Sequence, residues 1–256
     1  MSDVNRRAIL GGVALIALSP AARSDDRGMP PAMEADDSPA VLTRFAAHRT
    51  GRRPSVVMLH GARGFDLKPR AYERYADALT AEGIDAWFLR FYTPADAQKM
   101  ATLAEQPARE AYDSERYPAW SKRVSSTITT LLARTDSSGR IGLLGFSLGG
   151  FVAAATAASD PRVSALALLY SGMPDTFVRQ VTRLPPTIEL HGEADRNVPV
   201  ATGDAFVALA RAVGAPVEQV RYPGKGHGFD FADNDPDMID AIIRVARFFG
   251  EHLGAG

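Results

Sequence analysis

Residues 140–158 read RIGLLGFSLGGFVAAATAA, which sets the pentapeptide Gly145-Phe-Ser-Leu-Gly149 between an apolar run and a stretch of small apolar residues. An apolar run that ends in G-x-S-x-G and continues into a helix-compatible stretch is typical of a nucleophile elbow, a tight turn between a strand and a helix. The glycines are needed because this turn leaves no room for side chains two positions before and after the serine. The segment therefore predicts that Ser147 is exposed at the carboxyl edge of a sheet.

A serine hydroxyl is a weak nucleophile at neutral pH, so it needs a base to accept its proton and an acid to orient that base. Asp195 lies in the segment HGEADRNVP, and His227 lies in the segment GKGHGF, each just past an expected strand. The chain order Ser, Asp, His is the one expected of α/β-hydrolases. We therefore predict Ser147, His227 and Asp195 as a catalytic triad, with Glu193 as the nearest alternative acid. The other four histidines are weaker candidates for the base.

Two backbone N–H groups are predicted to form an oxyanion hole. Leu148 would begin the helix after the serine, so its N–H can face an oxyanion. The second donor usually comes from the loop after an earlier strand. The segment His60-Gly-Ala-Arg-Gly64 follows the apolar run 55–59 and fits this place, with Ala62 as the predicted donor. We expect His60 to hold this loop by hydrogen bonds; the alternative for the loop is a plain glycine turn.

Strand-like and helix-like segments alternate along the chain. The strands are expected at 41–48, 54–60, 84–91, 140–146, 163–170, 187–191 and 216–222, and the helices at 68–82, 118–134, 148–159, 201–213 and 236–253. In the last helix, one face is expected to carry Ile239, Ile242, Ile243, Ala246, Phe249 and Leu253. This alternation predicts an α/β-hydrolase fold with a mostly parallel central sheet, helices on both faces and residues 41–48 at an edge.

Two connections are longer than the geometry of a parallel sheet requires. Residues 92–117 contain three tyrosines and are predicted to form a partly helical cover over the site; the alternative is a surface hairpin without substrate contact. Residues 171–184 follow a strand and should lie near its carboxyl end, where ligands bind in open α/β sheets. The residues expected to contact substrate are Arg63, Tyr92, Met173 and Phe229.

Composition bounds the remaining classes of function. A chain of 256 residues with 46% hydrophobic content can bury one large core, so residues 41–256 are expected to form a single domain. The net charge of −1 and the lack of any block rich in Lys or Arg argue against a nucleic-acid partner. The chain has no cysteine, which excludes disulfides, thiolate metal sites and a cysteine nucleophile.

Residues 233–237, DNDPD, are spaced like a calcium loop but lack the glycine and the distal glutamate of an EF-hand. Asp235 before Pro236 is better explained as the cap of the last helix. No metal and no cofactor are therefore expected.

The N-terminal residues have the order of a secretory signal. Asn5-Arg-Arg7 precedes the uncharged apolar stretch 8–18 and the small residues 19–22, and the apolar stretch is too short to span a bilayer comfortably. The paired arginines and the residues after them are similar to the twin-arginine export motif. We expect residues 1–22 to be an export signal, 23–40 to be a linker, and the protein to be periplasmic or secreted without stable membrane insertion. The alternative is a buried or disordered apolar segment.

Taken together, the segments 60–64, 145–150, 191–199 and 226–229 resemble the dienelactone hydrolase family of α/β-hydrolases, and the resemblance covers residues 41–253. The resemblance implies the fold, the triad and ester-type chemistry. The namesake enzymes use a cysteine nucleophile activated by a glutamate of the oxyanion loop, where this chain has Ser147 and Gly61. They also bind the substrate carboxylate with arginines, one of them shortly after the catalytic histidine, where this chain has Asp230 and Phe231. These differences favour another substrate.

The resulting hypothesis is an exported serine hydrolase that cleaves a small carboxylic ester or lactone through an acyl-enzyme intermediate. A serine peptidase or aminoacyl hydrolase of the same fold is the nearest enzymatic alternative. A non-catalytic binding protein on a hydrolase scaffold is a further alternative, although the complete Ser, Asp, His set argues against it. The oligomeric state is not predicted by the sequence.

If export uses the twin-arginine route, replacing Arg6 and Arg7 by lysine is expected to trap the precursor inside the cell, because that route recognises the paired arginines. Cell fractionation and N-terminal sequencing measure this, with the mature chain of the unmodified protein beginning after about Ala21 or Ala22. Unchanged export in a strain that lacks the twin-arginine translocase would assign the general secretory route instead. Recovery of only full-length protein from the cytoplasm would contradict export.

Overall fold

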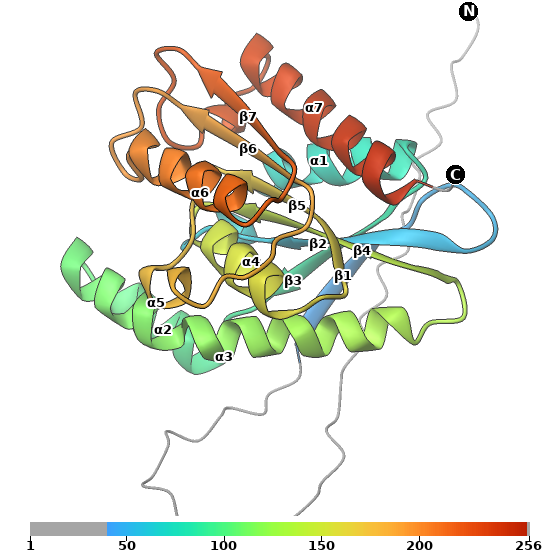
Figure 1. Ribbon diagram of the computed structural model, residues 1–256, viewed down its shortest axis with the longest axis horizontal. Helices are drawn as coiled ribbons and strands as arrows, with labels where there is room; N and C mark the ends of the chain where they lie inside the picture. Colours follow the sequence, from blue (N-terminus) through green and yellow to red (C-terminus); the bar gives the residue numbers. More distant parts are fainter. Residues whose placement is uncertain (1–39, 255–256) are drawn as a thin grey trace, which may run out of the picture.

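The computed structural model describes residues 40–254, which form a seven-stranded sheet with helices on both faces (Figure 1). The strands are β1 (Val41–Phe45), β2 (Arg53–Leu59), β3 (Asp85–Arg90), β4 (Ser137–Phe146), β5 (Val163–Leu169), β6 (Thr187–Gly192) and β7 (Val217–Tyr222), in the spatial order β1-β3-β2-β4-β5-β6-β7. Strands β2 to β7 run parallel, and β1 pairs antiparallel with β3 at the edge. The predicted fold class is confirmed.

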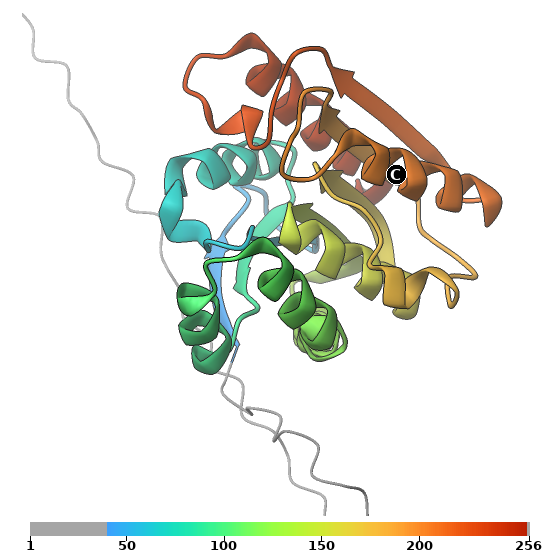
Figure 2. The same cartoon turned by 90° about the vertical axis from the view of Figure 1, so that its left-hand side faces the viewer.

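The helices form one layer on each face of the sheet (Figures 1 and 2). One layer contains α1 (Pro69–Ala81) and α7 (Pro236–Leu253), and the other contains α3 (Gln106–Leu132), α4 (Leu148–Ser159) and α6 (Val200–Ala212). The shorter elements are α2 (Pro94–Thr102), α5 (Asp175–Val178) and single 3-10 turns at Phe65–Leu67 and Phe229–Phe231. The predicted elements that match these ranges differ from them by at most three residues at either end, apart from the start of α3.

Strand β2 shows why a continuous apolar run folds as a central parallel strand. Val57 and Leu59 face the layer of α3 and α4, whereas Val56 and Met58 face the layer of α1 and α7. All four side chains are fully buried, because alternate residues of a strand point to opposite faces and both faces are covered.

Helix α3 begins at Gln106 and continues through Pro118, so the predicted helix start at residue 118 is wrong. A proline inside a helix removes one N–H donor, a cost that tertiary packing can offset. Here the offset comes from Tyr117 and Trp120, which are buried on the two sides of the proline. Their rings pack together at 6.0 Å, and Trp120 also packs against Tyr92 at 5.2 Å.

The segment between β3 and β4 is mostly helical, as expected, and a buried carboxylate holds its two helices together. The N-terminus of α2 has a capping box, in which Thr93 and Asp96 bond to each other's backbone N–H groups. Asp96 also accepts hydrogen bonds from Tyr112 at 2.7 Å and from Trp120 at 2.9 Å, both on α3. Burial opposes the charged form, but these bonds and the Arg116 ion pair prevail and lower the pKa of Asp96 to about 2.

The buried face of α7 agrees with the predicted one at Ala246, Phe249 and Leu253 but not at the isoleucines. Ile239 and Ile243 are 49% and 58% exposed. The buried residues are Met238, Ala241, Val245, Ala246, Phe248, Phe249 and Leu253. The two phenylalanines fill more space against the sheet than the isoleucines would, so they decide how the helix is rotated. Asp235 does cap this helix, because its side chain accepts the N–H of Asp237 at 3.0 Å.

The predicted export signal at 1–22 and all but the last residue of the predicted linker lie outside the described residues. Between residues 40 and 254, no helix is long and apolar enough to cross a membrane.

Candidate active site

Ser147 occupies the sharp turn between β4 and α4. Its backbone has φ 51° and ψ −122°, a conformation that is strained for a residue with a side chain. A Cβ atom on Gly145 would lie 2.4 Å from Gly150 Cα, and a Cβ atom on Gly149 would lie 2.3 Å from the carbonyl oxygen of Leu59. The first turn of α4 therefore touches the backbone of β2 and β4 directly, which only glycine permits.

The side chains of Ser147, His227 and Asp195 form one hydrogen-bonded series. The serine Oγ lies 2.9 Å from His227 Nε2, and His227 Nδ1 lies 2.7 Å from Asp195 Oδ2. The other carboxylate oxygen, Asp195 Oδ1, accepts the N–H groups of Asn197 at 2.8 Å and Val198 at 3.0 Å. This arrangement allows the imidazole to take a proton from the serine while a carboxylate holds it from behind.

The acid of this series is buried and stays charged. Asp195 is 7% exposed, whereas Glu193, the alternative acid, is exposed to solvent. Burial disfavours the carboxylate, but the nearby His191 and His227 prevail and hold the pKa of Asp195 well below its usual range. The geometry therefore favours Asp195 over Glu193 as the partner of the base.

Backbone contacts join the loop that carries the acid to the loop that carries the base. The N–H of Ala194 donates to the carbonyl of Lys225 at 2.9 Å, and the N–H of Glu193 donates to the carbonyl of Tyr222 at 3.0 Å. A Cβ atom on Gly192 would lie 2.3 Å from the same Lys225 oxygen. The glycine at the end of β6 thus sets how closely the two loops approach.

Aromatic side chains support His227 from the core. The ring of Tyr170 meets the imidazole edge to face at 4.6 Å, and Tyr170 has a positive φ of 42°. Phe229, predicted to contact substrate, is instead 7% exposed and packs on Tyr170 and Tyr222. Asp230 is fully buried and accepts the hydroxyl of Tyr75 at 2.9 Å; burial raises its pKa to about 6.

The predicted oxyanion loop lies against the serine. A Cβ atom on Gly61 would be 3.6 Å from Ser147 Cβ, and the N–H of Gly61 donates to the hydroxyl of Tyr72 at 3.3 Å. His60 Nδ1–H donates to the carbonyl of Gly61 at 2.8 Å. Burial lowers the pKa of His60 to about 4, so this histidine is neutral and acts as a hydrogen-bond donor to the loop, as expected.

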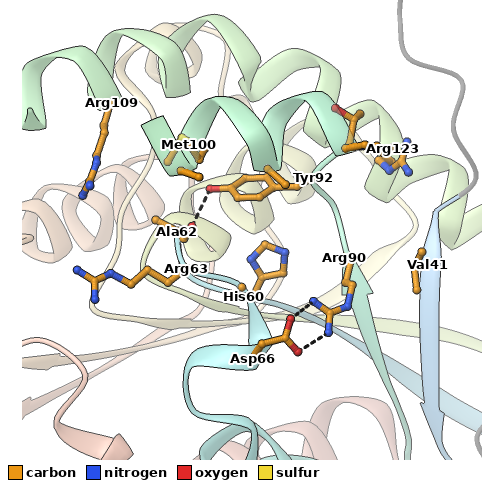
Figure 3. A pocket seen from close by; sticks show the side chains of 15 residues that line it. Val41, His60, Ala62, Arg63, Asp66, Arg90, Tyr92, Met100, Arg109 and Arg123 are labelled. Atoms are coloured by element: carbon orange, nitrogen blue, oxygen red, sulfur yellow. Dashed lines mark hydrogen bonds and ion pairs between the residues drawn. The ribbon is translucent and has the colours of Figure 1, made fainter. Parts of the chain in front are cut away.

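A cavity of about 640 Å³ adjoins this loop (Figure 3). Its lining comes from β1, from the oxyanion loop and the 3-10 turn after it, from β3 and the residues after it, and from α2 and α3: Val41, His60, Ala62, Arg63, Gly64, Asp66, Arg90, Tyr92, Thr93, Pro94, Ala97, Met100, Ala101, Arg109 and Arg123. Tyr92 reaches across it to donate a hydrogen bond to the carbonyl of Ala62 at 3.3 Å. Arg90 is held by Asp66 through two bonds of 2.7 and 2.8 Å.

Of the four residues expected to contact substrate, the structure places Arg63 and Tyr92 in this cavity. Met173 is 7% exposed and belongs to the core beside Leu148, so like Phe229 it has a packing role. The sequence reasoning missed Tyr72 and Tyr170, which support the oxyanion loop and the base. Their signal is weak, because an aromatic residue in a helix or strand is most often only part of the core. Within residues 40–254, no group of His, Asp and Glu is arranged to hold a metal ion.

Comparison with known proteins gives one family. The model of the dienelactone hydrolase family matches residues 41–252. A protein from Methylorubrum extorquens named "Putative carboxymethylenebutenolidase" is 29% identical over an alignment that covers 64% of this chain and 53% of that protein. This chain therefore spans about half the length of that relative.

Solved structures share the fold. A dienelactone hydrolase from Anabaena variabilis has a TM-score of 0.69 and 16% identity, with 94% of this chain and 99% of that chain covered. Carboxyl esterase 2 from Tuber melanosporum has a TM-score of 0.69 and 14% identity, with 98% of this chain and 89% of that chain covered.

Gly192→Ala is expected to lower the free energy of unfolding by about 1–3 kcal/mol, because its Cβ would push the acid and base loops apart. Gly226→Ala is the matched control, since the nearest atom to its Cβ would be Ala194 O at 3.9 Å. We expect the control to change stability by less than about 0.5 kcal/mol. Urea denaturation measures both, and equal stability of the two variants would contradict the steric argument.

Proposed function

The chain belongs to the dienelactone hydrolase family, and we propose that it is a serine hydrolase that cleaves a carboxylic ester or lactone through an acyl-enzyme intermediate. The observation that carries this proposal is the hydrogen-bonded series from Ser147 through His227 to Asp195. We also propose that the protein acts outside the cytoplasm, which the sequence of residues 5–22 favours.

In the proposed reaction, Ser147 Oγ attacks the carbonyl carbon of the ester while His227 Nε2 accepts the hydroxyl proton. His227 then gives this proton to the departing alkoxide, which leaves as the alcohol. A water molecule attacks the acyl-enzyme in the second half, and His227 again takes a proton and returns it to Ser147. Asp195 keeps the imidazole in the tautomer and orientation that both halves need.

Each tetrahedral intermediate carries an oxyanion, and we assign the N–H groups of Leu148 and Ala62 to its stabilisation. Leu148 is the first residue of α4, so its N–H lies at the positive end of the helix dipole. The close packing of Gly61 on Ser147 supports the second donor, because it brings the next residue of the loop, Ala62, to the serine. Loss of one such donor costs an enzyme about 10²–10³ in kcat.

Ser147→Ala is expected to lower kcat by about 10⁴-fold or more with the fold intact, because the triad acts as a unit. The same substitution should abolish labelling by a fluorophosphonate probe. His227→Ala should cost more than Asp195→Asn, since the acid orients the base and does not carry the proton. Circular dichroism checks folding, and steady-state hydrolysis of p-nitrophenyl acetate measures activity.

Glu193→Gln is the matched control for Asp195→Asn, because both substitutions remove one carboxylate from the same loop. We expect Glu193→Gln to leave kcat nearly unchanged. A larger loss of kcat in Glu193→Gln than in Asp195→Asn would show that Glu193, and not Asp195, is the acid. A folded Ser147→Ala protein that kept most of its activity would overturn the proposed function.

We further propose that neutral short-chain esters are better substrates than lactones with a free carboxylate. A substrate carboxylate that is buried without a charged partner costs several kcal/mol of binding free energy. Asp230, at the position where the namesake enzymes have an arginine, is buried against Tyr75 and offers no cation. Arg90 already binds Asp66 with both of its terminal nitrogens.

The expected result is a higher kcat/KM for p-nitrophenyl acetate than for a dienelactone. Arg63→Ala tests the exposed arginine of the cavity, and Arg70→Ala on α1 is its matched control. A clear preference for the dienelactone would refute the proposal. Loss of that preference in Arg63→Ala, but not in Arg70→Ala, would assign Arg63 as the carboxylate partner.

A further inference from the structure

Two fully buried ionisable side chains lie on β6, directly behind the acid of the triad. Glu189 and His191 are two residues apart on the strand, so their side chains point to the same face. His191 Nδ1 lies 2.8 Å from Glu189 Oε1, and His191 Nε2 lies 2.9 Å from the carbonyl oxygen of Val198. The second carboxylate oxygen of Glu189 forms an ion pair with Arg221 of β7.

The partners of His191 determine its protonation. A backbone carbonyl can only accept a hydrogen bond, and the carboxylate of Glu189, paired with the Arg221 guanidinium, also accepts. Both ring nitrogens of His191 therefore face acceptors. A neutral ring would turn a lone pair toward one of these oxygens and leave that buried acceptor without a donor, which costs free energy. Burial opposes the charge, but the nearby Asp195 and the bond to Glu189 raise the pKa of His191 to about 9.

The imidazolium of His191 acts on Asp195 in two ways. Its Nε2 lies 3.6 Å from Asp195 Oδ2, the oxygen that accepts His227. It also holds the turn that follows the acid, because the carbonyl of Val198 accepts from His191 while the N–H of Val198 donates to Asp195 Oδ1 at 3.0 Å. One cation thus fixes both the charge of the acid and the backbone that binds it.

We propose that His191 is a positioning residue of the triad: held as an imidazolium by Glu189, it keeps Asp195 ionised and directed at His227. This inference rests on the proposed function. It gives the enzyme a fixed positive charge behind the acid, in addition to the positive charge that appears on His227 during each proton transfer.

Helix α6 is shaped to fit this ion pair. A Cβ atom on Gly203 would lie 2.4 Å from Glu189 Oε1 and 2.7 Å from His191 Nδ1, so the helix backbone rests on the pair itself. The next residue, Asp204, is exposed and binds Arg221 at 2.7 Å. Charges therefore alternate from Asp204 through Arg221, Glu189 and His191 to Asp195, and no two like charges are neighbours.

Glu189→Gln tests the proposal with little change of shape. A glutamine can donate to His191 Nδ1, so the ring no longer needs a second proton and becomes neutral. We expect kcat to fall by about 10- to 100-fold with KM unchanged, because Asp195 is held less firmly. The acid limb of the kcat/KM profile should move up by about one pH unit, since loss of a cation beside Asp195 favours the protonated form of His227.

The matched control is Glu218→Gln on the neighbouring strand β7, where the carboxylate is exposed and binds only Arg244 at 3.6 Å among the described side chains. It should leave kcat and the pH profile unchanged. Gly203→Ala gives a second route to the same effect, because its methyl group would displace the Glu189–His191 pair without altering either side chain.

Nitrogen NMR of the wild-type protein labelled at histidine measures the charge of His191 directly. At pH 7.5 we expect both ring nitrogens of His191 to be protonated; one unprotonated nitrogen would overturn the proposal. A Glu189→Gln enzyme with the kcat and pH profile of Glu218→Gln would overturn it as well. Failure of wild-type Ser147 to react with a fluorophosphonate would refute the proposed function instead, while the NMR result would still decide the charge of His191.

Discussion

The close backbone contact between the first turn of α4 and strands β2 and β4 is the constraint on which the site depends. Gly149 rests on the carbonyl of Leu59, and Gly145 rests on Gly150, so any side chain at the two positions nearest the crossing would separate helix from sheet. This contact raises Ser147 above the sheet edge and leaves the space in which Gly61 packs against it. The position of Ser147 therefore depends on a contact between helix and sheet that is possible only because these glycines have no side chain.

The parts that could be predicted from the sequence are those with a local physical signal. The elbow glycines, the continuous apolar strands and the short segments around Asp195 and His227 each depend on neighbours in the chain. The path of α3 through Pro118, the rotation of α7 and the burial of Phe229 were not predictable in this way. They are decided by which large side chains fill the space between layers, and that depends on residues far apart in the sequence. The catalytic roles of the three triad residues stay predictions.

Glu189 and His191 carry a signal of another kind. Charged groups in a strand buried on both faces need partners, because an isolated charge in a protein interior is costly. The sequence shows the two residues but not the partners, which come from β7, α6 and the loop after β6. The result is a row of alternating charges that ends at Asp195. Such a row fixes the electrostatic potential at Asp195 without any group that must move during the reaction.

Asp96 holds α2 and α3 together by bonds that do not involve Ser147, Asp195 or His227. These helices wall one side of the cavity, yet the bonds that define their mutual geometry are made within the segment between β3 and β4. Insertions, deletions or substitutions there can reshape the cavity and alter which molecules fit, while the elbow and the loops of Asp195 and His227 keep their own supports. Related proteins can therefore differ in this segment, and so in the molecules that fit the cavity, while the residues around Ser147, Asp195 and His227 stay the same.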